Sequence, residues 1–174
     1  MKNKRGLVSK ALALAVVAAI SVGATSAYFT DKKSVTNTFT VGDVKIGIEE
    51  TEWNKPGANH DIAPGESLGK NPVINNTGKN SCWIRVKIDY DSKIFELVGV
   101  NNTEWTLSGG YYYYNSIVPV AGKTSAVFTS VKMKDDFKEP VNGGELNVIV
   151  NAEAVQSDGF ETYTEAFKAA ENDF

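Results

Sequence analysis

Hydrophobic and polar residues alternate with a period of two along much of the chain after residue 40. The segment 81–90 shows this alternation best. Because successive side chains of a strand point to opposite faces, the segment is predicted to be a strand with one face in the core and one in water. The predicted inward residues are Cys82, Ile84, Val86, Ile88 and Tyr90, and the predicted outward residues are Trp83, Arg85, Lys87 and Asp89.

Further strand patterns follow, and glycine- and asparagine-rich turns separate them. Short strands at this spacing are typical of an antiparallel β-sandwich. A change of parity at Gly42-Asp43 indicates a turn or bulge between two strand pieces. The additional predicted strands are 38–49 in its two pieces, a strand from about Asn71, and the segments 94–100, 104–107, 110–118, 125–133 and 145–155.

The hydrophobic period changes near the C-terminus. Apolar residues recur every three to four positions between Phe160 and Ala170, which is the period of a helix. We therefore expect a short amphipathic helix near 160–172, starting at about Thr162 and packed on the sandwich. No internal repeat or linker indicates a second domain, so residues 40–174 are predicted to form one all-β domain with this helix.

The first 27 residues have the pattern of a signal peptide. Basic residues precede the apolar run 11–20. This run is shorter than the roughly 20 residues of a spanning helix. Small residues favour cleavage between Ala27 and Tyr28, and a cut after Ser26 is the alternative. The protein is thus expected to be secreted and to contact the membrane only transiently.

The charge of the mature chain disfavours nucleic acid as a partner. The 18 Lys and Arg residues of the whole chain include four in the leader, which leaves 14 against 21 Asp and Glu, a net charge of −7. A surface of this sign repels polyanions, and no basic stripe is present to bind a phosphate backbone.

The residues of catalytic sites are scarce. His60 is the single histidine, whereas a zinc site of the HExxH type needs two. A serine triad would require the same histidine, and no G-x-S-x-G motif is present. Cys82 is the single cysteine, so it forms no intrachain disulfide, and its predicted inward position makes it a poor thiolate. The sequence therefore predicts no catalytic, cofactor-binding or metal-ligating residue.

Aromatic residues suggest an alternative function. Trp53, Trp105, Tyr111 and Tyr113 could form a platform on which sugar rings stack. Packing within the sandwich is the other interpretation, because a strand at 111–114 would place two tyrosines on each face. A cell-wall or carbohydrate-binding module is therefore the second functional hypothesis.

Four short motifs, taken in order, resemble one family. They are Tyr28-Phe29-Thr30-Asp31, the stretch TNTFTVG at 36–42, the Pro64-Gly65 turn that leads to Asn76-Thr77-Gly78, and VQSDGF at 155–160. In their combination the chain resembles the TasA/camelysin family, with a signal peptide of the kind cut by a SipW-type signal peptidase. The resemblance implies a jelly-roll sandwich, export through Sec in Gram-positive bacteria, and assembly as a fibre of the biofilm matrix or cell surface.

The resemblance also implies a mode of assembly. In fibre-forming relatives the new N-terminal segment donates a strand to the neighbouring subunit, and this segment corresponds here to residues 28–39. The partners would be copies of this chain or homologous matrix subunits. The alternative is that residues 28–39 join their own sheet and the protein stays monomeric. The candidate donor residues are Tyr28, Phe29, Asp31, Val35 and Phe39.

Some relatives carry a metallopeptidase label. We do not transfer this activity on the sequence, because one histidine and no recognisable motif leave a metal without ligands.

Overall fold

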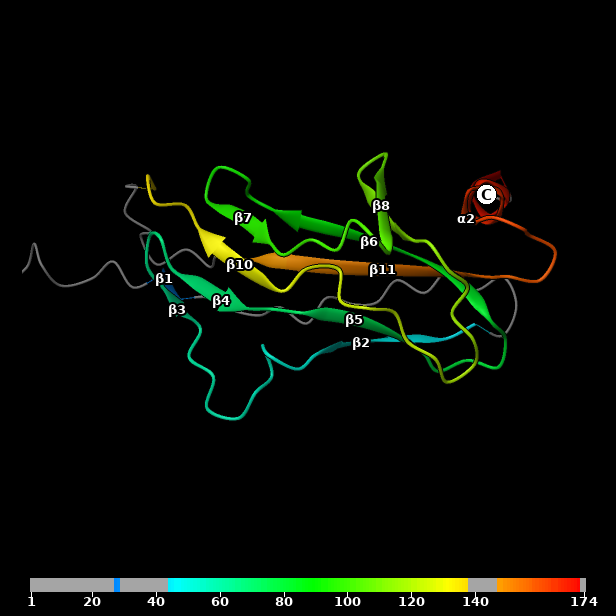
Figure 1. The fold of residues 1–174 in the computed structure, drawn as a ribbon, viewed down its shortest axis with the longest axis horizontal. Helices are drawn as coiled ribbons and strands as arrows, with labels where there is room; N and C mark the ends of the chain where they lie inside the picture. The colour runs from blue at the N-terminus through cyan, green and yellow to red at the C-terminus, as the bar shows by residue number, and fades with distance from the viewer. Residues whose placement is uncertain (1–26, 29–43, 138–146, 173–174) are drawn as a thin grey trace, which may run out of the picture.

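The computed structural model describes residues 27–28, 44–137 and 147–172. These residues form two facing layers of antiparallel strands, with one helix near the end of the sandwich (Figure 1). The prediction of an all-β sandwich with a short C-terminal helix is therefore confirmed. No helix in these ranges is both long and apolar enough to cross a membrane.

The first layer is built on a long antiparallel pairing between residues 66–76 and 122–133. At one end the Asn76 amide donates to Gly122 O, and at the other the Met133 amide donates to Glu66 O, both at 2.9 Å. Strands β2 and β7 flank this pairing on either side. The strands of the layer are β2 (Ile46–Glu50), β4 (Ser67–Gly69), β5 (Pro72–Asn76), β7 (Phe95–Val98) and β10 (Ser130–Met133).

The second layer has the strand order β11-β6-β9-β8. Its two long strands pair over their whole length, from Val148 opposite Tyr90 to Gln156 opposite Cys82. The strands are β6 (Cys82–Tyr90), β8 (Trp105–Ser108), β9 (Tyr111–Tyr114) and β11 (Val148–Gln156). Near one end of the sandwich, the two-residue strand β1 (Ala27–Tyr28) pairs with β3 (Asp61–Ile62) (Figure 1).

The core lies between the two layers. Cys82, Ile84 and Val86 of β6 are fully buried, as the alternation predicts. Across from them, Phe128 and Val131 of the first layer are also fully buried. The same parity holds in β11, where Val148, Val150, Ala152 and Ala154 are buried on the core side.

The predicted outward face of β6 is not all in water. Trp83 and Arg85 are only 6% and 7% exposed, so the prediction is wrong for these two residues. The cause is helix α2 (Tyr163–Asn172), which packs on this face and buries Trp83 together with Val155 and Phe167. The molecule therefore has a second, smaller apolar cluster outside the sandwich.

Helix α2 begins where the sequence pattern places it. Gly159 turns the chain with a φ of 87°. Thr162 then caps the helix, since the Glu165 amide donates to Thr162 Oγ1 at 3.2 Å and the Glu165 carboxylate accepts from the Thr162 amide at 3.3 Å. This reciprocal arrangement is a capping box, which satisfies amides that have no partner within the helix.

Several of the predicted strands are longer than the observed ones. The predicted strand 125–133 is regular only over β10. The Val127 amide donates a hydrogen bond to the Pro72 carbonyl, but Pro72 has no backbone N–H to donate in return, so the regular pairing is interrupted there. The predicted strand 110–118 is regular only over β9. The predicted strand at 145–155 begins at Val148, and the first piece of 38–49 lies outside the described residues.

The burial of β6 predicts a large cost for a truncation in the core. The Ile84→Ala variant should lose about 2–5 kcal/mol of unfolding free energy, because the surrounding layers cannot close the cavity fully. Urea unfolding measures this loss. The Val98→Ala variant, at a position 37% exposed, serves as the control and should change by less than about 0.5 kcal/mol.

Candidate functional site

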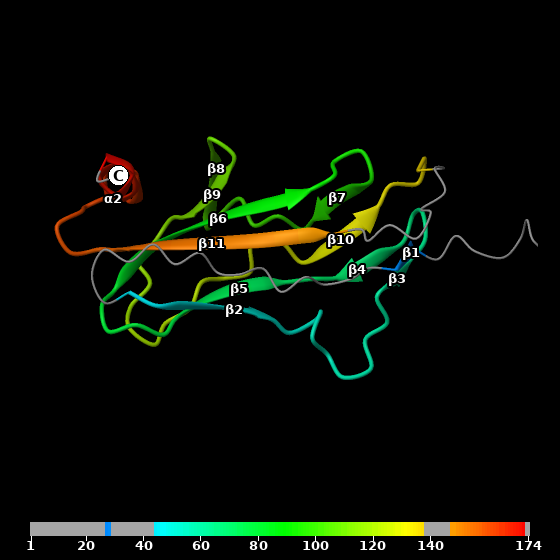
Figure 2. The same ribbon diagram turned by 180° about the vertical axis from the view of Figure 1, so that it is seen from behind.

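A row of polar and aromatic side chains crosses the outer face of the second layer. Strand register places Glu153 of β11 opposite Arg85 of β6, Arg85 opposite Tyr113 of β9, and Tyr113 opposite Thr106 of β8. All four side chains share one face, because directly paired residues of antiparallel strands lie side by side. Helix α2 lies over this face (Figure 2).

Arg85 is the centre of this row. Its guanidinium donates to Glu153 at 2.7 Å, to Glu171 of α2 at 2.7 Å, and to the Tyr113 hydroxyl at 3.3 Å. Burial lowers the pKa of Arg85, but the hydrogen bonds to Glu171, Tyr113 and Glu153 outweigh it and raise the pKa above its ordinary value. Arg85 therefore stays charged and joins the helix to the sheet.

Aromatic rings surround the same guanidinium. Its central carbon lies 4.1 Å from the ring centre of Tyr111 and 4.5 Å from that of Phe167. Tyr113 stacks on Tyr163 of the helix, with ring centres 4.9 Å apart and planes 24° apart. Cation–π contacts of a desolvated arginine are stabilising, so these rings help to fix the charged group.

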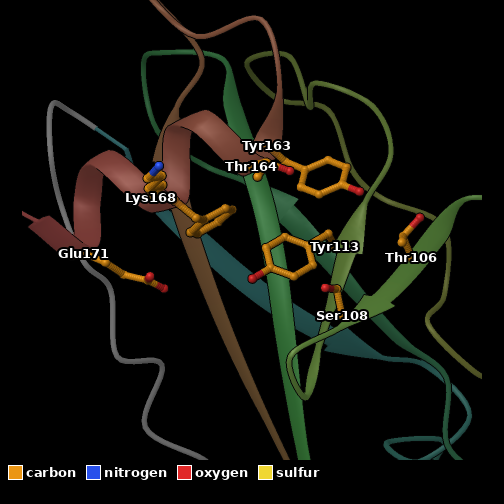
Figure 3. Close-up of a pocket in the computed structure, with 8 residues that line it drawn as sticks. Thr106, Ser108, Tyr113, Tyr163, Thr164, Lys168 and Glu171 are labelled. Carbon is orange, nitrogen blue, oxygen red and sulfur yellow. The ribbon is translucent and has the colours of Figure 1, made fainter.

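A groove of about 260 Å³ opens beside this row, between α2 and the β8–β9 hairpin (Figure 3). It combines aromatic rings, hydroxyl groups and two opposite charges. Sequence reasoning missed it, because no local pattern shows that a helix from residues 163–172 will meet the hairpin. The groove is lined by Thr106, Ser108, Tyr113, Tyr163, Thr164, Phe167, Lys168 and Glu171.

The aromatic surface predicted from the sequence is only partly present. Trp53 and Trp105 are 2% and 1% exposed, so they cannot offer a ring to a ligand. Tyr111 and Tyr113 lie on the outer face around Arg85, and Tyr113 lines the groove. Packing inside the sandwich therefore accounts for the tryptophans but not for these two tyrosines.

A second polar cluster lies at Trp53, in the first layer. Lys70 is buried, and its Nζ lies 2.8 and 2.9 Å from the two carboxylate oxygens of Glu50 and 4.6 Å from the Trp53 ring centre. His60 stacks on the Trp53 ring, with the two ring centres 3.9 Å apart, and its Nε2 lies 2.9 Å from Trp53 O. The pairing of Lys70 with Glu50 satisfies a buried charge, and nothing in the alternation predicted it.

Strands β11 and β2 are the outermost described strands of their layers. Within the described ranges, β11 pairs only with β6 and β2 pairs only with β5. The two strands, one from each layer, contact each other. Strand β11 is nine residues long, which is long for the outermost strand of a sheet.

The candidate donor segment is described only at its start. Tyr28, with Ala27 at the predicted cleavage point, forms β1 and pairs with Asp61 of β3. Phe29, Asp31, Val35 and Phe39 lie outside the described residues.

Comparison with known families gives a match over residues 1–104 to the family described as camelysin metallo-endopeptidase. These residues make up more than half of the 174-residue chain. The chain belongs to the camelysin family. No curated protein matches it significantly.

The camelysin family name implies a catalytic metal, and the residues that the structure describes do not fit one. In the described part of the chain, no three His, Cys, Asp or Glu side chains lie close enough together to hold a metal ion. The only histidine of the sequence stacks on Trp53 and faces a backbone carbonyl. Structural and catalytic zinc sites need three or four converging ligands, so we derive no catalytic step through a metal.

Cys82 is also unsuited to act as a nucleophile in this camelysin-family chain. It is fully buried on the inner face of β6, and its backbone pairs with Val118. Burial raises the pKa of its thiol to about 12, so the thiolate is absent at neutral pH.

The raised pKa of Cys82 predicts a loss of stability in alkali. Above pH 9.0 the unfolded chain releases the thiol proton while the folded chain keeps it up to about pH 12, so the unfolded state becomes favoured as the pH rises. The slope should reach about 1.4 kcal/mol per pH unit in this window and vanish below it.

Urea unfolding of the native chain and of Cys82→Ala at pH 7 to 11 isolates this contribution. The difference in unfolding free energy between the two proteins should be constant below pH 9 and change above it. A difference that stays constant over the whole range contradicts the buried, protonated thiol.

Proposed function

We propose that the chain is a secreted structural subunit of an extracellular fibre, in the biofilm matrix or on the cell surface, that assembles by N-terminal strand donation. Membership of the camelysin family and the signal-peptide pattern of residues 1–27 support secretion. A SipW-type signal peptidase would release the mature chain at Tyr28. The function rests on shape and edge pairing and needs no catalytic residue.

The observation that carries the proposal is the position of β11 as the outermost described strand of its layer. Its inner side pairs with β6 over all nine residues. A strand from a neighbouring subunit would extend the layer beyond β11 by β-augmentation.

The side chains of β11 suit an added strand. On its core side, Ala152 and Ala154 are small and fully buried, and β2 of the other layer lies against the same strand. A donated strand on β11 would thus extend the second layer beside the edge of β2. Alternate apolar residues of the donor, such as Val35 and Phe39, would then face the gap between the two layer edges.

The donor segment starts at a position that already forms strand pairs. Tyr28 pairs with Asp61 in the single chain, and Ile62 next to it is buried. The chain therefore offers pairing partners to the beginning of residues 28–39. In the proposed fibre, each subunit pairs its donor strand with the next subunit. Because this head-to-tail contact does not close into a ring, repeated addition of subunits produces a filament.

Electron microscopy tests the proposal. The mature chain from Tyr28 should form filaments, whereas a chain that begins at Thr40 should stay monomeric, because it retains the acceptor edge but lacks the donor strand. Both proteins are compared by negative staining at the same concentration and ionic strength.

A Val35→Pro variant of the mature chain is the matched control for length. Proline removes a backbone donor from the added strand and should abolish filaments while leaving the domain folded. Filaments from the chain that begins at Thr40, or monomers from the mature chain, would contradict the proposal.

A further inference from the structure

The groove between α2 and the β8–β9 hairpin has the composition of a sugar-binding site. Its lining includes the ring of Phe167 and the stacked pair Tyr113 and Tyr163. Thr106 and Ser108 of the hairpin and Thr164 of the helix add hydroxyl groups (Figure 3). Sugars present apolar ring faces and many hydroxyl groups, so they bind where aromatic rings and hydrogen-bonding groups converge.

The polar groups of the groove are held in place before a ligand arrives. Arg85 donates to Glu171 Oε1 at 2.7 Å and to the Tyr113 hydroxyl at 3.3 Å. Arg85 is itself fixed by Glu153, at 2.7 Å. The Glu171 side chain is 61% exposed, so its other carboxylate oxygen can accept from a ligand hydroxyl. Such preorganisation lowers the cost of binding.

The charge of the groove selects among ligands. Lys168 and Glu171 line it, and Arg85 and Glu153 lie directly behind it. These two cations balance the two carboxylates. A site for phosphate or for an acidic sugar would need an excess of positive charge, which this groove lacks.

We propose that this groove binds an uncharged sugar unit of a cell-wall or matrix polysaccharide. One sugar face packs on the exposed part of the Tyr163 and Tyr113 rings, and the sugar hydroxyls bond to Ser108, Thr164 and Glu171. The site lies on the outer face of the second layer near α2, away from the β11 edge, so sugar binding and strand donation involve different surfaces.

Sugar binding to the secreted chain tests the inference. Isothermal titration is run against neutral oligosaccharides of glucose, galactose, mannose, xylose and N-acetylglucosamine, with polygalacturonate as the anionic polymer. At least one neutral oligosaccharide should bind. In a Ser108→Ala/Thr164→Ala double variant its dissociation constant should rise about tenfold or more, because two hydrogen bonds to the ligand are lost.

The variants are chosen to leave the fold intact. Ser108 and Thr164 are exposed, and alanine at these positions keeps the backbone of strand and helix. Glu171→Gln keeps an acceptor and should weaken binding less than the double variant does. Thr103→Ala, an exposed threonine outside the groove, should bind like the native chain. Circular dichroism confirms that each variant is folded.

Three results would overturn the inference. These are no binding of any neutral oligosaccharide, binding of the anionic polymer alone, and unchanged affinity in the folded double variant. None of them depends on whether filaments form, so this test is separate from that of the proposed fibre.

Discussion

The pairing of β6 with β11 is the interaction on which the rest of the structure depends. Nine consecutive residue pairs fix the two strands in one register. A slip of β6 by one residue would turn Ile84 away from the core and bring Arg85 into it. The register therefore sets two features together: the core on the inner face and the Arg85 row on the outer face.

The outer face shows how a short helix converts a sheet surface into a groove. Alone, the face of Trp83 and Arg85 would expose a large ring and a cation to water. Helix α2 covers both residues, and Glu171 completes the partners of the guanidinium. The capping box at Thr162 fixes where the helix starts and therefore which of its residues meet the hairpin. The position of the groove is thus a consequence of strand register and helix capping.

The sequence predicted the parts of this fold that depend on local period. The inward face of β6, the change to a helical period near Thr162 and the antiparallel sandwich all follow from alternation and turn residues. The burial of Trp83 and Arg85 on the outer face could not be predicted in this way, because it depends on a helix about 80 residues away in the chain. Lys70 and Glu50 were missed for the same reason, since a buried ion pair has no signature in either residue's own neighbourhood. Tyr111 and Tyr113 were found as candidates through their aromatic run, whereas Glu171 and Ser108 became visible only with the tertiary structure.

The most direct test of strand donation is amide hydrogen exchange with the donor supplied in trans. An isotope-labelled chain that begins at Thr40 is measured with and without a synthetic peptide of residues 28–39. Strand donation predicts that amides of β11 exchange more slowly when the peptide is bound than when it is absent, because alternate amides of an outermost strand point toward an added strand. Protection that falls on β7 or β8 instead, or no protection at all, would contradict β11 as the acceptor edge.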